Sequence, residues 1–365
     1  MRADISAVDV REVTPEDGPA LVDSAEAISS ETEFLVEPGA LLPLKGVASE
    51  LLLDLRKSGN GTYYLAVCDG SIVGYLAAFR GSMQRASAVI TVVAVGLRRS
   101  YRGKGVGVRL LKAAREWACQ KGARRLELIV EEANRGAISL YQKAGFRIEG
   151  RIADATFRDG SWHADLWMGL ALEREEELPH WDMLELRPPK LRVDISQVTF
   201  GAPCAEHAQQ LHEWERALLA GSSIHLKLPG EVPFRQQIVS HLSSSRANGT
   251  HAAMSAFAYR RGEKRIVGHV SGQVGSAPRD RNLIFRLNVL PQYTGAGIGR
   301  RLADEIEAWA RQNGMRRLST WLQGHNARGL SFAEQRGFQR EIISREYAII
   351  DGRLCDRVAL GKVLT

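Results

Sequence analysis

The feature that most constrains the fold is an internal repeat. The segment YRGKGVG at 101–107 recurs as YTGAGIG at 293–299, an offset of 192 residues. The same offset aligns further identical residues without a gap: Trp117 and Trp309, Gly122 and Gly314, Asn134 and Asn326, Ser139 and Ser331, Gly145 and Gly337, Phe146 and Phe338, Asp159 and Asp351. Because such a repeat means that one supersecondary unit is used twice, the sequence predicts two similar domains.

The chain has 365 residues, of which 44% are hydrophobic, which is enough to give each of two domains its own core. The charged, proline-bearing stretch 172–193 lies between the copies and is typical of a linker. We therefore place the two domains at 1–178 and 190–365.

Each copy predicts a mixed α/β (α+β) unit. The β-branched run 86–97 is typical of a strand, whereas the apolar residues of 108–122 recur at helical spacing. In chain order the rest of the first unit is a buried strand at 124–130, a short helix at 134–146 capped by Asn134, and a hairpin about Asp159-Gly160. Upstream, 62–79 and 257–274 are typical of hairpins in the two halves.

Composition argues against several classes of protein. The four cysteines form no C-x-x-C pair and the nine histidines no ligand-spaced group, so we expect a reducing compartment and no metal. The first 20 residues lack the apolar region of a signal peptide, and no apolar run approaches the ~18 residues that span a bilayer. These features predict a cytoplasmic protein without a membrane partner.

The net charge of +7 is uneven along the chain. Residues 1–180 hold 23 Lys and Arg against 25 Asp and Glu, whereas the remainder holds 26 against 17. A basic half can indicate nucleic-acid binding, but no stretch resembles a base-reading motif. We expect no nucleic-acid partner, and we interpret the excess as a solvated surface together with a site for a phosphate-bearing cofactor.

The repeated loop is a predicted anion site, because the first turn of a helix has free N–H groups and a partial positive charge. Glycines let a phosphate approach the backbone closely, and Arg102 and Lys104 add charge. The G-x-x-x-x-G-K-[ST] pattern of a P-loop is absent. A dinucleotide site needs G-x-G-x-x-G and a later acid; Glu131 fits in the first copy, but Gln323 replaces it in the second.

The order strand, [QR]-x-x-G-x-[GA], helix, strand, Asn and LYxKxGF resembles the GNAT superfamily of acetyl-CoA-dependent N-acetyltransferases. The stretch ETEFLVEPG at 31–39 also resembles bacterial members. The first copy carries the complete pattern: Arg102, Gly105, Gly107, Asn134, Tyr141, Gly145 and Phe146. The resemblance implies two GNAT-like domains, each with a splayed, mainly antiparallel mixed sheet flanked by helices.

The resemblance also implies roles for individual residues, with acetyl-CoA as the co-substrate. The strand before the loop would carry a bulge and diverge from the next strand, so that the pantetheine arm pairs with the backbone at Val95 and Leu97. The N–H near Val95 would polarise the thioester carbonyl, Tyr141 would protonate the departing thiolate, and Asn134 would bond the pantetheine. The loop amides that would hold the pyrophosphate belong to Arg102, Gly103, Lys104, Gly105, Val106 and Gly107.

The second copy departs from the pattern. Thr294 replaces the loop arginine and Ala333 replaces the tyrosine. The residues that would still bind coenzyme A are Val289, Gly295, Ala296, Gly297, Ile298, Gly299 and Asn326. We therefore expect the first half to catalyse and the second to bind coenzyme A weakly or to act as a scaffold.

The resemblance implies acetyl transfer to a primary amine by direct attack in a ternary complex. The acceptor could be an amino sugar, an aminoglycoside, a polyamine, or a peptide or protein amine. The strand 86–97 has no acid, so the base stays open; Glu127 and Glu131 are candidates that we interpret as surface carboxylates. An alternative is a regulatory or scaffold protein that binds coenzyme A without turnover, as a monomer or homodimer. Acids expected near the amine are Glu26, Glu31, Glu33, Glu37, Asp154 and Asp165.

Overall fold

The computed structural model describes residues 7–35, 45–81, 89–172, 178–180, 194–220, 225, 227, 232–233, 236, 238, 251–260, 263–274 and 281–364. Glu37, the start of the predicted strand 86–97 and most of the predicted linker 172–193 lie outside these residues. No helix in the described part is long and apolar enough to cross a membrane.

The chain forms two compact units. The first comprises Met1–Arg151, Ala164–Leu178 and Ser344–Ile349; the second comprises Ile152–His163, Pro179–Ile343 and Ile350–Thr365. Each unit draws most of its residues from one half of the sequence; the exceptions are Ile152–His163 in the second unit and Ser344–Ile349 in the first.

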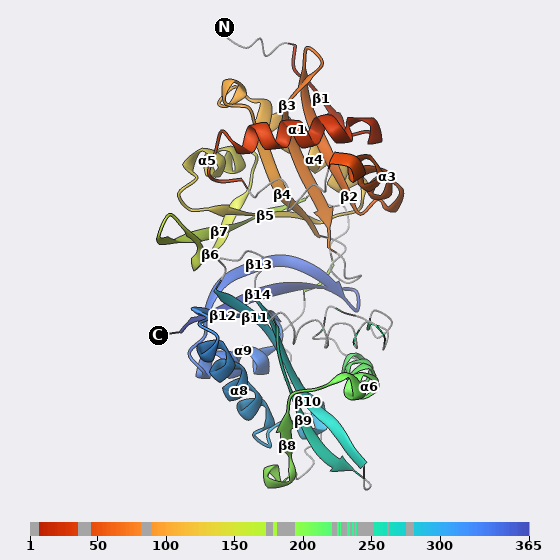
Figure 1. Cartoon of the computed structure of the whole chain (residues 1–365), viewed down its shortest axis with the longest axis vertical. Helices are drawn as coiled ribbons and strands as arrows, with labels where there is room; N and C mark the ends of the chain where they lie inside the picture. Colours follow the sequence, from red (N-terminus) through yellow and green to blue (C-terminus); the bar gives the residue numbers. More distant parts are fainter. Residues whose placement is uncertain are drawn as a thin grey trace. The chain divides into compact units, whose positions relative to one another are not determined.

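The first unit is built on a sheet in the order β1-β2-β3-β4-β5-β7, in which only the β4–β5 pair is parallel. Its strands are β1 (Asp9–Glu12), β2 (Gly61–Cys68), β3 (Ser71–Arg80), β4 (Val89–Leu97) and β5 (Arg125–Glu131), with the first part of β6 (Arg147–Arg158) and most of β7 (Ser161–Ala171). Its helices are α1 (Gly18–Ser29), α3 (Ala48–Ser58), α4 (Val106–Gln120) and α5 (Arg135–Lys143). Figure 1 shows α1 lying across the strands of this sheet.

Two apolar clusters hold the first unit together. On one face, α4 packs Leu110, Leu111 and Ala114 against a core that includes Ile90 and Leu128. On the other face, residues of α1 and α3 pack against β2 and β3. Each fully buried leucine contributes about 1.5–3 kcal/mol to the free energy of unfolding. The apolar face of α4 that was predicted from its spacing is confirmed as the face that packs in the core.

The second unit repeats this plan with strands ordered β12-β11-β10-β9-β8, and β11–β12 is its parallel pair. Its strands are β8 (Thr199–Gly201), β9 (His251–Arg260), β10 (Glu263–Val274), β11 (Asn282–Val289), β12 (Arg317–Gln323), β13 (Gln339–Ile350) and β14 (Arg353–Val363). Its helices include α6 (Ala208–Leu219), α8 (Ile298–Gln312) and α9 (Ala327–Gln335). One apolar cluster joins α8, α9 and the sheet.

The repeat is confirmed element by element. The bounds of α4, β5, α5, β6 and β7 each recur 192 residues later in α8, β12, α9, β13 and β14. The four predicted hairpins form, and the Asp-Gly turns place both residues at positive φ, for example 50° at Asp159 and 79° at Gly160. The mixed α/β fold with a mainly antiparallel sheet is therefore confirmed. Helix α4 begins two residues earlier than its apolar pattern predicts, at Val106 instead of 108.

Candidate functional site

Strands β4 and β5 separate partway along their length. Their parallel pairing is confined to Val89–Arg125, Ile90–Leu126 and Thr91–Glu127. Beyond this point β4 continues to Leu97 and β5 continues along β7. The pairing of β4 with β3 also shifts, because Ala77 faces Ala94 while Ala78 faces Val92, which leaves an extra residue at position 93. The bulge and the divergence that the resemblance implies are both present.

Val95 and Leu97 lie on the part of β4 that has left β5. Val95 is opposite Leu76 and Leu97 is opposite Gly74 across the β3 pairing. Both side chains are half-buried against the core. Their backbone groups on the β5 side are thus outside the β4–β5 ladder, which is the edge that an extended ligand could pair with.

The glycine loop joins the end of β4 to α4. Gly103 and Gly105 have φ of 71° and 85°, a conformation that residues with a side chain rarely adopt. A Cβ at either position would meet no atom within 4 Å, so the space above the loop is open. The Arg109 N–H donates to the Gly105 carbonyl as the first bond of the helix. The N–H groups of the preceding turn therefore have no partner within the helix.

The other residues of the first loop differ in their surroundings. Val106 is fully buried, so its backbone is the part that could meet a ligand, and Lys104 is half-buried. A Cβ at Gly107 would lie 2.8 Å from Leu140 Cδ2, which shows that this glycine allows α4 to pack closely against α5. The exposed Arg102 donates from Nε to the Leu97 carbonyl at 2.9 Å, which directs its guanidinium along the loop.

A carboxylate occupies the cationic side of this loop. Glu31 lies just beyond the end of α1, and its Oε1 is 3.1 Å from Arg98 Nε, while Oε2 is 3.8 Å from Arg102 Nη2. The Arg99 N–H also donates to the Glu31 carboxylate. The arginines beside the predicted anion site are therefore already paired with a carboxylate, which belongs to the segment expected near the acceptor amine. Sequence reasoning assigned Glu31 to that segment and missed its contact with the loop.

Asn134 caps the start of α5, and Tyr141 lies in the last turn of that helix. The Tyr141 ring is 7% exposed in the core and 6.0 Å from the Phe146 ring centroid. Burial raises the pKa of Tyr141 to about 12, so the phenol stays protonated near neutral pH. Asn134 Oδ1 accepts a hydrogen bond from the Ala137 N–H at 3.1 Å, which confirms its predicted capping role.

The interpretation of Glu127 as a surface carboxylate is wrong. Its side chain is buried, with Oε2 3.5 Å from Arg125 Nε. Arg125 is 2% exposed and also donates to both carboxylate oxygens of Glu149. A Cβ at Gly169 would overlap Arg125 and Glu149, which explains the glycine there. Because a buried cation needs paired charges, Glu127 is committed to Arg125.

Glu131 has a different position at the far end of β5. It is half-buried and lies directly opposite Asp165 of β7 in the antiparallel pairing. Residues opposite one another share a face of the sheet, so these two carboxylates lie together beyond the point where β4 leaves β5. Among the other expected acids, Asp154 is 2.7 Å from Arg316 within the second unit, whereas Glu26 and Glu33 are exposed.

The second copy repeats the divergence of its strands but not the bulge. Strand β11 pairs with β12 only at Asn282–Arg317, Leu283–Leu318 and Ile284–Ser319. Its pairing with β10 is regular up to Val289 opposite Gly268. Asn326 caps α9 by accepting from the Gly329 N–H at 3.0 Å, and Ala333 is buried where the first copy has Tyr141.

The second loop keeps its backbone shape but is partly covered. Gly295 and Gly297 have φ of 88° and 85°. A Cβ at Gly297 would lie 2.9 Å from Ile195 Cδ1, in contrast with the open space at Gly105. Of the remaining predicted residues, Ile298 is buried and Ala296 is half-buried against the core, and a Cβ at Gly299 would lie within 3.9 Å of the Leu287, Val289 and Phe332 side chains.

Arg328 restores a cation to the second loop. Its Nη1 donates to Thr294 Oγ1 at 2.9 Å, and its Nη2 is 3.9 Å from the position of a Gly295 Cβ. Sequence reasoning missed this residue, although the aligned position in the first copy is Gly136 and the substitution of arginine for glycine was visible. Within the described residues no group of three or more His, Cys, Asp or Glu is arranged to hold a metal ion.

Comparison with known proteins agrees with this geometry. A family model described as "Acetyltransferase (GNAT) family" matches residues 33–146 and 224–338. An L-methionine sulfoximine/L-methionine sulfone acetyltransferase of Pseudomonas paraeruginosa is 29% identical over 118 residues, which are 30% of this chain and 64% of the relative. The chain thus covers less than two thirds of that relative's length.

Two further similarities each cover less than half of this chain. An uncharacterized N-acetyltransferase of Mycobacterium bovis is 30% identical over 149 residues, which are 39% of this chain and 90% of the relative. The crystal structure of a GNAT-family acetyltransferase from Streptococcus pneumoniae has a TM-score of 0.43 and 29% identity. That likeness covers 46% of this chain and 99% of the other.

Proposed function

The chain belongs to the acetyltransferase (GNAT) family, and we propose on that premise that its first half transfers an acetyl group from acetyl-CoA to a primary amine. The observation that carries the proposal is the combination, in the first copy alone, of a bulged β4 that leaves β5, an open glycine loop and a buried tyrosine. The proposed domains are 1–178 and 190–365.

The cofactor would bind along the edge and the loop. The amides of 102–107 and the Arg102 guanidinium hold the pyrophosphate, because they combine helix-terminal N–H groups with positive charge. The pantetheine arm pairs with β4 at Val95 and Leu97, beyond the last β4–β5 pair. Asn134 uses Oδ1 as a cap, which leaves its amide NH₂ to bond the arm.

Transfer proceeds by direct attack of the neutral amine on the thioester carbonyl. The Val95 N–H stabilises the negative charge that develops on the carbonyl oxygen. The C–S bond breaks, and Tyr141 gives its proton to the departing thiolate; its raised pKa keeps that proton available. The nitrogen loses its extra proton to Glu131, which lies opposite Asp165, whereas Glu127 is committed to Arg125.

A small-molecule amine is the proposed acceptor. Glu131 and Asp165 would attract an ammonium group before its deprotonation. The curated names of similar proteins include an acetyltransferase of two amino-acid analogues and a mycothiol acetyltransferase of Corynebacterium efficiens. Both names describe small acceptors, which supports testing amino acids, amino sugars and polyamines before peptides.

A second function is proposed for the second half, which is binding of coenzyme A without turnover. Arg328 beside Thr294 supports the binding, and the buried Ala333 where Tyr141 stands in the first copy argues against catalysis. Ile195 over Gly297 must move for a phosphate to enter, so this site is expected to be the weaker one.

The experiment is release of free coenzyme A thiol from acetyl-CoA in the presence of a panel of amines. We expect amine-dependent release that Gly105→Glu abolishes and Gly297→Glu leaves within about twofold. Equal loss of activity in both variants, with both still folded by circular dichroism, would contradict the assignment of catalysis to the first half.

A further inference from the structure

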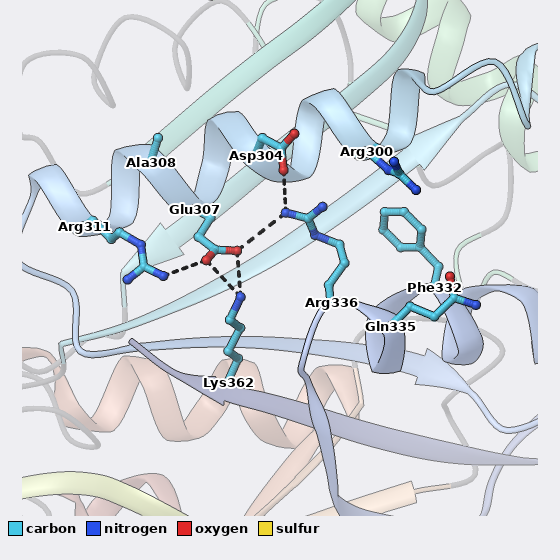
Figure 2. Close-up of a pocket in the computed structure, with 9 residues that line it drawn as sticks. All are labelled: Arg300, Asp304, Glu307, Ala308, Arg311, Phe332, Gln335, Arg336 and Lys362. Atoms are coloured by element: carbon cyan, nitrogen blue, oxygen red, sulfur yellow. Dashed lines mark hydrogen bonds and ion pairs between the residues drawn. The ribbon is translucent and has the colours of Figure 1, made fainter. Parts of the chain in front are cut away.

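The second unit has a charge-lined depression that begins next to its glycine loop and extends along α8. Its volume is about 570 Å³, within the range of small-molecule sites. None of the loop residues 293–299 lines it. Figure 2 shows its walls, which come from one side of α8, the end of α9 and β14: Arg300, Asp304, Glu307, Ala308, Arg311, Phe332, Gln335, Arg336 and Lys362.

The lining has more cations than carboxylates. Glu307 accepts hydrogen bonds from Lys362 at 2.8 and 2.9 Å and from Arg311 at 2.7 Å. Asp304 accepts one from Arg336 at 2.6 Å. Desolvation would raise the pKa of Glu307, but these donors outweigh it and hold the pKa below its usual value, so the Glu307 carboxylate is ionised at neutral pH. The lining thus carries two more positive than negative charges.

Two of the arginines have donors to spare. Within the described part of the chain, the Arg300 side chain makes no hydrogen bond or ion pair, and Figure 2 shows it drawn without an interaction near Phe332. The Arg336 side chain is 18% exposed, and its Nε is buried without a partner in that same part. A buried donor left unpaired is costly, and a ligand acceptor would satisfy it.

The charges that line the depression are peculiar to the second copy. At the positions of Arg300, Arg311, Arg336 and Lys362, the first copy has Val108, Cys119, Ala144 and Leu170. It also has Lys112 and Arg115 in place of the two carboxylates. The shared fold therefore does not require this arrangement of charges.

We propose that this depression binds a small molecule that carries a dianionic phosphate ester beside a flat ring. A phosphate monoester has a charge of about −1.5 to −2 at pH 7, which matches the surplus of two. Arginine forks bind phosphate oxygens in pairs, and Arg300 and Arg336 supply the free donors. The half-buried Phe332 offers its ring to a planar group next to the phosphate.

Phenyl phosphate is the probe, because it combines the dianion and the ring. The full chain is titrated by calorimetry at low ionic strength, with and without saturating coenzyme A. We expect a single binding site for phenyl phosphate. Coenzyme A should change the affinity of this site for phenyl phosphate by less than twofold, because no residue of the loop 293–299 lines the depression. Affinity falls several-fold between pH 7.5 and 5, because the second phosphate pKa is about 6.

Three variants locate the site. Arg300→Gln breaks no hydrogen bond or ion pair among the described residues. It should lower the affinity for phenyl phosphate about tenfold, as expected for the loss of a charged hydrogen bond. Phe332→Leu introduces the residue that the first copy has at this position. This variant should bind phenyl phosphate more weakly but inorganic phosphate with unchanged affinity. Arg301→Gln is the matched control, because Arg301 pairs with Glu305 outside the lining.

The inference is overturned if the parent protein binds no phenyl phosphate, or if Arg300→Gln and Arg301→Gln have equal effects. It is also overturned if coenzyme A displaces the probe, since binding would then be at a glycine loop. Because the depression lies outside both loops, these outcomes do not depend on whether the first half acetylates amines.

Discussion

Replacing Glu31 with glutamine should strengthen acetyl-CoA binding at the first loop. Glu31 holds Arg98 and Arg102 at 3.1 and 3.8 Å and accepts from the Arg99 N–H. In the proposed complex the pyrophosphate takes the Arg102 guanidinium, and the Glu31 charge beside Arg98 and the Arg99 N–H also lowers the positive potential next to the loop, so the carboxylate competes with the cofactor. Glu31→Gln removes the competing charge and retains an amide oxygen that can still accept from the backbone.

The magnitude follows from the two ion pairs. The side chains of Glu31, Arg98 and Arg102 are 22%, 40% and 38% exposed, so solvent screens each pair to about 0.2–1 kcal/mol. Their sum is about 0.4–2 kcal/mol. Since 1.4 kcal/mol is a factor of ten, the Kd for acetyl-CoA should fall by about 2- to 30-fold, with about fivefold as the central expectation.

The assay is calorimetric titration with acetyl-CoA in the Gly297→Glu background, so that only the first loop is measured. Glu26→Gln is the matched control, because it removes the same charge from the exposed face of α1, one turn before Glu31. Weaker or unchanged binding in Glu31→Gln, with Glu26→Gln like the parent, would refute the competition. A gain in both variants would show a general charge effect instead.

Three further outcomes are expected. Tyr141→Phe should lower kcat about 100-fold with unchanged acetyl-CoA affinity, and an unchanged kcat would exclude the tyrosine as the acid. The rate of the parent protein should not fall with rising pH below about pH 11, because the pKa of Tyr141 is raised to about 12. Glu131→Gln should lower kcat/KM at pH 7 and recover towards the parent at pH 9 and above, where more of the amine is already neutral; a pH-independent loss would indicate a structural role. Leu110→Ala should lower the free energy of unfolding, measured in urea, by about 2–5 kcal/mol. Substitution of the exposed Val108 by alanine should lower it by less than about 0.5 kcal/mol; similar losses in the two variants would contradict the assigned core face.

Local patterns were enough to predict the repeat and its elements. Apolar spacing, the Asp-Gly turns and the Asn134 cap depend on neighbours a few residues away, and the structure confirms them. The positive φ at Gly105 and Gly297 is equally local, since a strand must turn sharply into a helix there.

Contacts between distant residues were beyond this reasoning. Glu31 meets its arginines across 68 residues of sequence, and no periodicity reports that approach. Glu127 is buried because Arg125 and the missing side chain of Gly169 make room for a paired charge, which depends on the register of β5 with β7. A charged residue on a strand is ordinarily exposed, so sequence alone favoured the wrong interpretation.

The central claim is that the first glycine loop is the principal acetyl-CoA site. The most direct test is calorimetric titration of acetyl-CoA into the parent, Gly105→Glu, Arg102→Glu and Gly297→Glu, each checked for a parent-like thermal transition. Arg102→Glu inverts the charge without requiring positive φ. The account predicts that both first-loop variants lose the tighter site and that Gly297→Glu keeps it. Retention of parent-like affinity in the two first-loop variants, or no binding by the parent, would contradict it.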